Sequence, residues 1–251
     1  MLYCLGEPFD KMVKRLATVK TPFVEVVDDG IHALDKRRVS ILKQAAKSYG
    51  ITFTVHSPFA DINVASPSKY MLSSALKRLK QSVAFTNDLE ARLWVLHPGS
   101  LTGISTFYPG KDWEQNCKSI SELHEVTEEF GVNMALENLP GKYGFIMKSA
   151  ADFSRFYRET GLNVGITFDV GHANLENQVF PFLETHADKI VHIHASDNLG
   201  ESDQHLGIGY GSIDWAGIGQ FLKRIEYSQT LITESSDHVQ ESVQKLKRLF
   251  D

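Results

Sequence analysis

The sequence predicts an α/β fold, a single-domain (β/α)8 TIM barrel in which eight strands alternate with eight helices. Three observations predict it. Short runs of β-branched and aromatic residues alternate along the chain with longer segments of helical period. The length of 251 residues is typical of one such barrel. No linker, low-complexity tract or charge block interrupts the alternation, so we expect one domain over residues 1–251.

Each predicted strand is a short run rich in Val, Ile, Phe, Thr or Leu, the composition favoured on a pleated surface. The alternative architecture for strands that alternate with helices is an open doubly wound sheet. The strands are predicted at residues 2–5, 23–27, 51–56, 93–97, 133–137, 164–169, 190–194 and 230–234.

The predicted helices lie between these strands. In the third helix, Leu72, Ala75, Leu76 and Leu79 form an apolar stripe at helical spacing, and Gly50 stands where the second helix should end. The helices are predicted at residues 9–19, 34–49, 69–89, 113–130, 150–160, 179–187, 215–227 and 239–249.

Composition excludes several classes of protein. The formal charge is -5 and 42% of the residues are hydrophobic, which is typical of a globular chain with no general attraction to nucleic acid. The two cysteines are too few and too far apart for a disulfide scaffold. The N-terminus does not resemble a signal peptide, and no apolar run approaches the roughly 20 residues that span a bilayer. We therefore expect a cytoplasmic protein that does not bind membranes.

Acidic and imidazole side chains stand at the ends of seven predicted strands. In a parallel barrel these ends converge on one face, where the active sites of this fold lie. Clustered carboxylates raise one another's pKa unless a cation neutralises them, so the pattern indicates a metal site. Oxygen and imidazole ligands without thiolates favour Zn²⁺ or Mn²⁺. The strand-end residues are Glu25, His56, His97, Glu137, Asp169, His194 and Glu234, of which Glu25 is left out of the ligand set because a cap or a local pair explains it equally well.

Three motifs add candidates at the same rim. Asp169-Val-Gly-His172 stands where a strand should turn into its loop, and we expect Gly171 to allow a sharp turn there. Asp197 follows His194 closely enough to orient a ligand or contact substrate. Asp203-Gln-His205 precedes a glycine-rich run without the Lys-Ser/Thr of a phosphate loop, and Asp214 is expected to cap the next helix.

Taken together, these motifs resemble those of the xylose isomerase-like barrels, a superfamily of sugar isomerases, sugar epimerases and the endonuclease IV family of DNA repair enzymes. The resemblance covers nearly the whole chain. Its most specific parts are His56-Ser-Pro-Phe with Ile62-Asn63, His97-Pro-Gly-Ser100, Leu136-Glu137-Asn138, Asp169-Val-Gly-His172, His194 to Asp197, Asp203-Gln-His205 with Gly209 and Gly211, and Thr233-Glu234.

The resemblance to endonuclease IV implies up to three metal ions and phosphodiester cleavage. Clustered ions activate water and neutralise the charge on the departing oxygen. The implied ligands are His56, His97 and Glu137 for the first ion, the bridging Glu137 with Asp169, His194 and Glu234 for the second, and His172, Asp203 and His205 for the third.

The resemblance to the sugar isomerases and epimerases implies one ion, held by Glu137, Asp169, His194 and Glu234. Glu137 and Glu234 are then the catalytic residues that move a proton between carbons through an enediolate. The candidate substrate-binding residues are His56, His172, Asp197, Phe59 and Lys142.

The sequence departs from the motifs of endonuclease IV and from those of the sugar epimerases, and these departures decide which of the two functions we expect. The loops Asp28-Asp29-Gly30 and Phe59-Ala60-Asp61 are acidic where endonuclease IV carries residues that enter DNA, so duplex DNA is not an expected partner. Between Lys189 and Lys223 the chain has no Lys or Arg for a substrate phosphate, which leaves helix N-termini, the metal ion or Lys142. We therefore expect a metal-dependent isomerase or epimerase acting on a small sugar or sugar phosphate.

Two alternatives remain from the sequence. One is a three-metal phosphodiester hydrolase of the AP endonuclease type, and the other is a non-catalytic sugar-binding barrel. The sequence leaves open whether the chains associate into a homo-oligomer.

Overall fold

The structure, a computed structural model, describes residues 4–19 and 21–250. It divides into two compact units, which we describe separately. Unit 1 comprises the described residues up to Leu136, and unit 2 comprises those from Glu137 onward. The described residues contain seven strands and nine α-helices.

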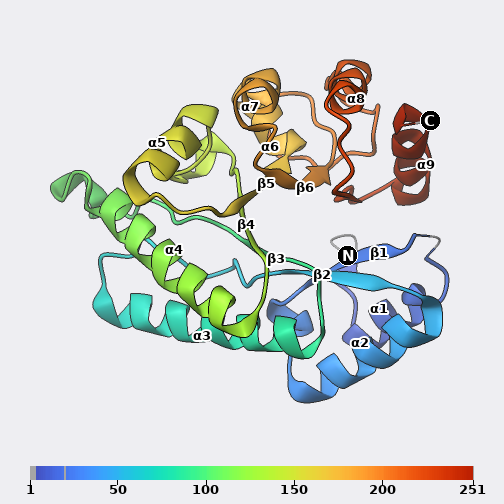
Figure 1. Cartoon of the computed structure of the whole chain (residues 1–251), viewed down its shortest axis with the longest axis horizontal. Helices are drawn as coiled ribbons and strands as arrows, with labels where there is room; N and C mark the ends of the chain where they lie inside the picture. Colours follow the sequence, from blue (N-terminus) through green and yellow to red (C-terminus); the bar gives the residue numbers. More distant parts are fainter. Residues whose placement is uncertain (1–3, 20, 251) are drawn as a thin grey trace. The chain divides into compact units, whose positions relative to one another are not determined.

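In unit 1 parallel strands alternate with helices. The strands pair in sequence order, with Val24 beside Phe53, Val55 beside Trp94 and Val95 beside Ala135. Helices α3 and α4 run side by side along this unit (Figure 1). Its elements are α1 (Phe9–Leu16), β1 (Phe23–Val27), η2 (Gly30–His32), α2 (Lys36–Tyr49), β2 (Thr52–His56), α3 (Lys69–Asp88), β3 (Trp94–Leu96), η3 (Ser105–Phe107), α4 (Lys111–Phe130) and β4 (Met134–Glu137), whose last residue opens unit 2.

Unit 2 continues the same alternation. Strand β6 pairs in parallel with β5 on one side, where Asp169 lies beside His194, and with β7 on the other, where Ala195 lies beside Thr233. The fully buried Phe182 packs edge to face with Phe153 and at a tilted angle with Phe168, between the helices and β5. The elements are η4 (Gly141–Tyr143), α5 (Ala150–Thr160), β5 (Gly165–Asp169), α6 (Val170–Leu175), α7 (Val179–His186), β6 (Ile190–Ala195), α8 (Trp215–Arg224), β7 (Thr230–Thr233) and α9 (Val239–Phe250).

Most predicted elements are confirmed to within a few residues at each end. Gly50 ends α2 with a φ of 65°, in the left-handed region, as predicted. Asp214 caps α8, because its Oδ1 accepts a hydrogen bond from the Gly217 N–H at 2.9 Å. The predicted strand at residues 2–5 falls mostly outside the described residues, and its described part, Cys4 and Leu5, is not in a strand.

The short helix α6 was not predicted. Asp169, the last residue of β5, caps it by accepting a hydrogen bond from the His172 N–H at 2.6 Å. Gly171 therefore lies within a helix, and the expected sharp turn is wrong. Glycine is favoured there for a different reason, since a Cβ atom would lie 2.7 Å from Oγ of Ser196, whose side chain would have to move.

No helix within the described ranges is long and apolar enough to cross a membrane.

Candidate metal centre

Four predicted ligands of unit 2 converge at the carboxyl ends of its strands. We call Glu137, Asp169, His194 and Glu234 the four-residue cluster. One ligand atom of each lies within 4.8 Å of those of the other three, and all four residues are buried. Three of them lie within strands β4, β5 and β6, and Glu234 follows β7 directly. Parallel pairing of β5, β6 and β7 therefore aligns their polar ends.

The distances in the four-residue cluster suit a divalent cation. Nδ1 of His194 lies 3.3 Å from Oε1 of Glu137, 3.5 Å from Oε2 of Glu234 and 4.0 Å from Oδ2 of Asp169. Ligand atoms at about 2.1 Å from a tetrahedral ion lie about 3.4 Å from one another. The spacing is therefore close to that of a coordination shell.

The electrostatics of Asp169 lead to the same conclusion. Burial raises the pKa of Asp169 to about 7, and although His172 opposes this rise, the carboxylates of Glu137 and Glu234 reinforce it. Within the part of the chain that the structure describes, Oδ2 of Asp169 has no hydrogen-bond partner. A buried, unsatisfied carboxylate oxygen among other carboxylates is stabilised by a cation, so these residues fit a divalent metal ion.

A second predicted ligand set also comes together in unit 2. We call His172, Asp203 and His205 the three-residue cluster. Oδ2 of Asp203 lies 3.2 Å from Nε2 of His172 and 3.1 Å from Nε2 of His205. Oδ1 of Asp203 and Nδ1 of His205 have no hydrogen-bond partner among the described residues. This donor set also fits Zn²⁺ or a related ion.

Contacts among neighbouring charged groups shift the pKa values of all three residues of the three-residue cluster. Burial alone would lower the pKa of His172, but the Asp169 carboxylate and the hydrogen bond to Asp203 raise it to about 10. Burial opposes ionisation of Asp203 too, yet its hydrogen bonds to the two histidines hold its pKa well below the usual range. Burial alone would lower the pKa of His205, but the hydrogen bond to Asp203 and the nearby carboxylates raise it to about 9.

The backbone holds His205 in an unusual conformation. Its φ of 48° lies in the left-handed region, which is uncommon for residues other than glycine. The His205 carbonyl accepts hydrogen bonds from Ser236, at 2.8 Å from the N–H and 3.1 Å from the hydroxyl. Ser236 stands two residues after Glu234, so the segment that carries one cluster also fixes a member of the other.

In unit 1 the predicted ligands His56 and His97 lie side by side. Their Nε2 atoms are 3.1 Å apart, and the ring of Phe59 lies 5.2 Å from that of His56 and 5.3 Å from that of His97, between centroids. The predicted ligand set of His56, His97 and Glu137 combines residues of both units and stays a prediction.

The acidic loop after β1 has a structural role. Asp28 is fully buried, forms an ion pair with Arg78 at 2.5 Å, and accepts a hydrogen bond from the Leu34 N–H at 2.6 Å. Oδ2 of Asp29 accepts hydrogen bonds from the N–H groups of Phe59 and Ala60, both at 2.8 Å. Both carboxylates therefore organise loops, and the charge of Asp28 is compensated by Arg78.

Two predicted substrate residues of unit 2 are engaged within the protein. The oxygens of the fully buried Asp197 accept hydrogen bonds from three backbone N–H groups and the Trp215 indole. The exposed Lys142 donates from its ammonium group to the Glu201 carbonyl. Their contacts with substrate stay predictions.

Sequence reasoning assigned no role to two asparagines beside the ligands. Asn138 follows Glu137 and Asn198 follows Asp197, and both are fully buried. The Asn138 amide bonds the main chain of Asp169, and the Asn198 amide donates to the Gly171 carbonyl at 2.9 Å. The sequence does contain a signal for both positions, since each asparagine directly follows a predicted site residue.

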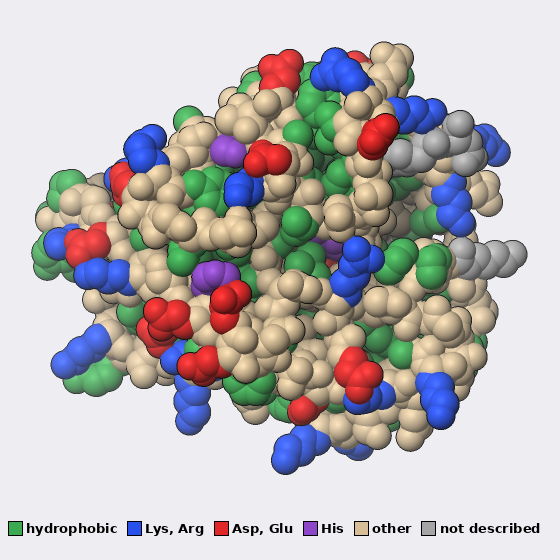
Figure 2. All heavy atoms as spheres, viewed as in Figure 1, with side chains coloured by type: hydrophobic (Ala, Val, Ile, Leu, Met, Phe, Trp, Pro, Cys, Tyr) green, Lys and Arg blue, Asp and Glu red, His purple; other side chains and the backbone are tan. Residues whose placement is uncertain are grey.

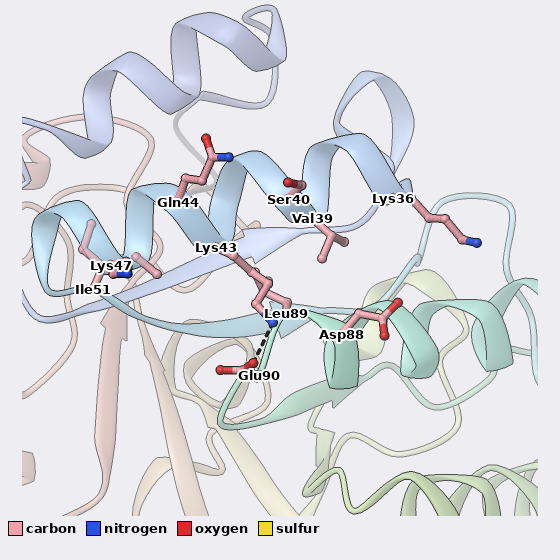
Figure 3. Close-up of a pocket in the computed structure, with 11 residues that line it drawn as sticks. Lys36, Val39, Ser40, Lys43, Gln44, Lys47, Ile51, Asp88, Leu89 and Glu90 are labelled. Atoms are coloured by element: carbon pink, nitrogen blue, oxygen red, sulfur yellow. Dashed lines mark hydrogen bonds and ion pairs between the residues drawn. The ribbon is translucent and has the colours of Figure 1, made fainter.

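A groove of about 890 Å³ on unit 1 is separate from all these residues. It lies along α2 and the end of α3, where Lys36, Lys43 and Asp88 line it (Figure 3). Nζ of Lys43 lies 2.6 Å from a carboxylate oxygen of Glu90 across it. None of the predicted site residues lines this groove, so the groove is not a candidate site for metal binding or catalysis.

Comparison of the sequence with known protein families identifies the family of this chain. The sequence pattern of the xylose isomerase-like TIM barrel family matches residues 13–249. The chain belongs to this family, which confirms the predicted fold class.

The proteins similar to this chain include sugar epimerases and endonucleases. It is 26% identical to the D-psicose 3-epimerase of Ruminiclostridium cellulolyticum, over 88% of this chain and 76% of that protein. It is also 26% identical to a probable endonuclease 4 of Aquifex aeolicus, over 79% of this chain and 74% of that protein. A solved structure of a D-tagatose 3-epimerase-like protein matches with a TM-score of 0.91 and 26% identity, covering 97% of this chain and 93% of the other.

Proposed function

We propose that this protein is a metal-dependent isomerase or epimerase of a sugar or sugar phosphate. The observation that carries the proposal is the four-residue cluster, in which two glutamates share a buried site with an aspartate and a histidine, all within 4.8 Å. The similarity to a D-psicose 3-epimerase and to a D-tagatose 3-epimerase-like protein supports it and favours a ketose as substrate.

The chemistry follows from the two glutamates. The four residues would hold a divalent ion, which when bound would supply the Lewis acid that polarises the sugar carbonyl and acidifies the adjacent C–H bond. Each glutamate has two carboxylate oxygens, so one can hold the ion while the other exchanges a proton. Glu137 removes the proton as general base, which leaves an enediolate, and Glu234 returns a proton to carbon as general acid.

The position of the returned proton decides the reaction. Delivery to the opposite face of the same carbon inverts its configuration and gives an epimer. Delivery to the neighbouring carbon, together with transfer of the hydroxyl proton from one enediolate oxygen to the other, gives an isomer. Both outcomes conserve atoms and electrons and use the same two groups, with neither oxidant nor water consumed.

The surface favours a small substrate. Figure 2 shows cationic and anionic side chains interspersed over the visible surface of each unit. The formal net charge is -5. Duplex DNA binding depends mainly on contacts between cations and phosphates, and a chain of net negative charge gains no general attraction to phosphates.

Proton exchange tests the proposal directly. Metal-stripped protein is reloaded with Mn²⁺, Co²⁺, Mg²⁺ or Zn²⁺ and incubated in D₂O with a panel of free ketoses and their phosphates. We expect deuterium at the carbon beside the carbonyl, together with an epimer or isomer, only when metal is present. If no metal gives exchange with any sugar of the panel, the proposal fails.

One observation favours a second candidate, a phosphodiester hydrolase. The three-residue cluster is fully assembled, and the similarity to a probable endonuclease 4 supports a multinuclear site. Elemental analysis of the loaded protein, together with an assay on duplex DNA containing an abasic site, tests it. Three ions per chain with strand cleavage would favour the hydrolase, and a single ion without cleavage would exclude it.

A further inference from the structure

Asn138 forms two hydrogen bonds through its side-chain amide at the four-residue cluster. Its Oδ1 accepts a hydrogen bond from the Asp169 N–H at 2.8 Å, and its Nδ2 donates to the Asp169 carbonyl at 2.9 Å. Both bonds go to the main chain of one residue, as a neighbouring strand would bond it. Because β4 ends at Glu137, the Asn138 side chain takes over the hydrogen bonding of β5 at this point.

This pairing fixes the direction of the Asp169 carboxylate. Holding the N–H and the carbonyl of one residue constrains both of its backbone dihedrals, and the side chain departs from the Cα atom between them. Asn138 is also joined covalently to Glu137. One asparagine therefore sets the relative placement of two members of the four-residue cluster.

The main chain of Asn138 reaches the three-residue cluster as well. Its carbonyl lies 2.9 Å from Nδ1 of His172, so this nitrogen donates the proton and Nε2 is left to face Asp203. Nδ1 of His172 also lies 3.4 Å from Oε1 of Glu137. Asn138 therefore contacts residues of both clusters.

We infer that Asn138 is a positioning residue whose side-chain amide sets the affinity and geometry of the four-residue cluster for a divalent ion. The inference deepens the proposed function and rests on its assignment of an ion to this cluster. Outer-sphere partners of metal ligands commonly contribute about 10- to 100-fold to metal affinity. We therefore expect the affinity of the four-residue cluster for the ion to fall by about 10- to 100-fold when the amide is removed.

Ion binding by stripped protein provides the test. Titration calorimetry with Mn²⁺ is performed in a His97→Ala/His205→Ala background, which removes one ligand from each of the other two predicted ion sites so that the isotherm reports the four-residue cluster. The variants are Asn138→Ala and, in case alanine prevents folding, Asn138→Ser, whose side chain is too short to bond both groups of Asp169. Circular dichroism and thermal melting establish that each variant is folded.

The matched control is Asn174→Ala. Asn174 lies in α6 of the same unit, and its amide donates at 2.9 Å to the side chain of Asn198 and not to the backbone of a ligand. We expect the dissociation constant of the control to stay within about twofold of its parent. The Asn138 variants should bind about 10- to 100-fold more weakly.

A spectroscopic readout separates positioning from a loss of stability. The visible absorption of Co²⁺ reports the arrangement of its ligands, and we expect it to change in the folded Asn138 variants. Parental affinity together with an unchanged Co²⁺ spectrum would overturn the inference, as would a parent protein that binds no ion. If wild-type protein binds the ion but gives no deuterium exchange, the proposed function fails while the inference stands.

Discussion

Oε1 of Glu137 lies 3.3 Å from Nδ1 of His194, in a site where both residues are almost completely buried. The contact joins the end of β4 to β6. A carboxylate and an imidazole placed this way share either a proton or a metal ion. The nearby carboxylates of Asp169 and Glu234 favour the ion, because a single proton leaves most of their negative charge uncompensated.

Glu234→Gln should lower the rate of deuterium exchange by about 100- to 10,000-fold, since glutamine retains a ligand oxygen but transfers no proton. The fold should be unchanged. The measurement is exchange by NMR with the metal-loaded variant and the substrate that wild-type protein accepts. Glu184→Gln, at an exposed glutamate of α7, is the matched control and should exchange at the wild-type rate. Near-normal exchange in Glu234→Gln would remove the proposed proton-transfer role.

His205→Ala should separate the two candidate functions. Because His205 belongs to the three-residue cluster alone, its loss should lower the number of bound ions while exchange on the sugar falls by less than about tenfold. Elemental analysis and the exchange assay are run on the same sample. Complete loss of exchange in this variant would show that the chemistry needs both clusters.

Metal binding to the three-residue cluster should release protons and strengthen with pH. The pKa of His172 is raised to about 10 and that of His205 to about 9, so both imidazoles hold a proton at neutral pH without metal. An imidazole must lose that proton to bind an ion. Affinity for Zn²⁺ should therefore rise between about pH 6 and about pH 9. Calorimetry in buffers of different ionisation enthalpy measures the release, and an affinity independent of pH would contradict the protonated state.

Arg78→Leu should destabilise the protein by about 2–3 kcal/mol, because it leaves the fully buried Asp28 carboxylate without its cation. Part of the loss is offset by water, since the Arg78 side chain is 27% exposed. Urea denaturation measures the free energy of unfolding. Lys43→Leu breaks the exposed pair with Glu90 and should cost at most about 1 kcal/mol. Equal effects of the two changes would contradict a structural role for Asp28.

The strand-end ligands could be predicted from sequence because the fold supplies the geometry. Asp169 and His194 are the last polar residues of two short apolar runs, and parallel pairing brings such ends together. The same rule places Glu234 beside them, although β7 itself ends one residue earlier. Each of these placements depends only on residue type and on the position of a strand end.

Features that depend on particular long-range contacts could not be predicted. Arg78 and Asp28 are 50 positions apart, and nothing in either segment identifies the other as its partner. Asp197 looks like a free carboxylate in the sequence, yet the glycine-rich loop folds around it and supplies its donors. Helix α6 depends on a cap from Asp169, a residue whose type indicated a metal ligand.

Anomalous X-ray diffraction from crystals of Zn²⁺-loaded protein tests the central claim most directly. The account predicts a zinc peak at about 2.0–2.2 Å from one atom each of Glu137, Asp169, His194 and Glu234. A fully loaded crystal with zinc elsewhere and no peak among these four residues would contradict it.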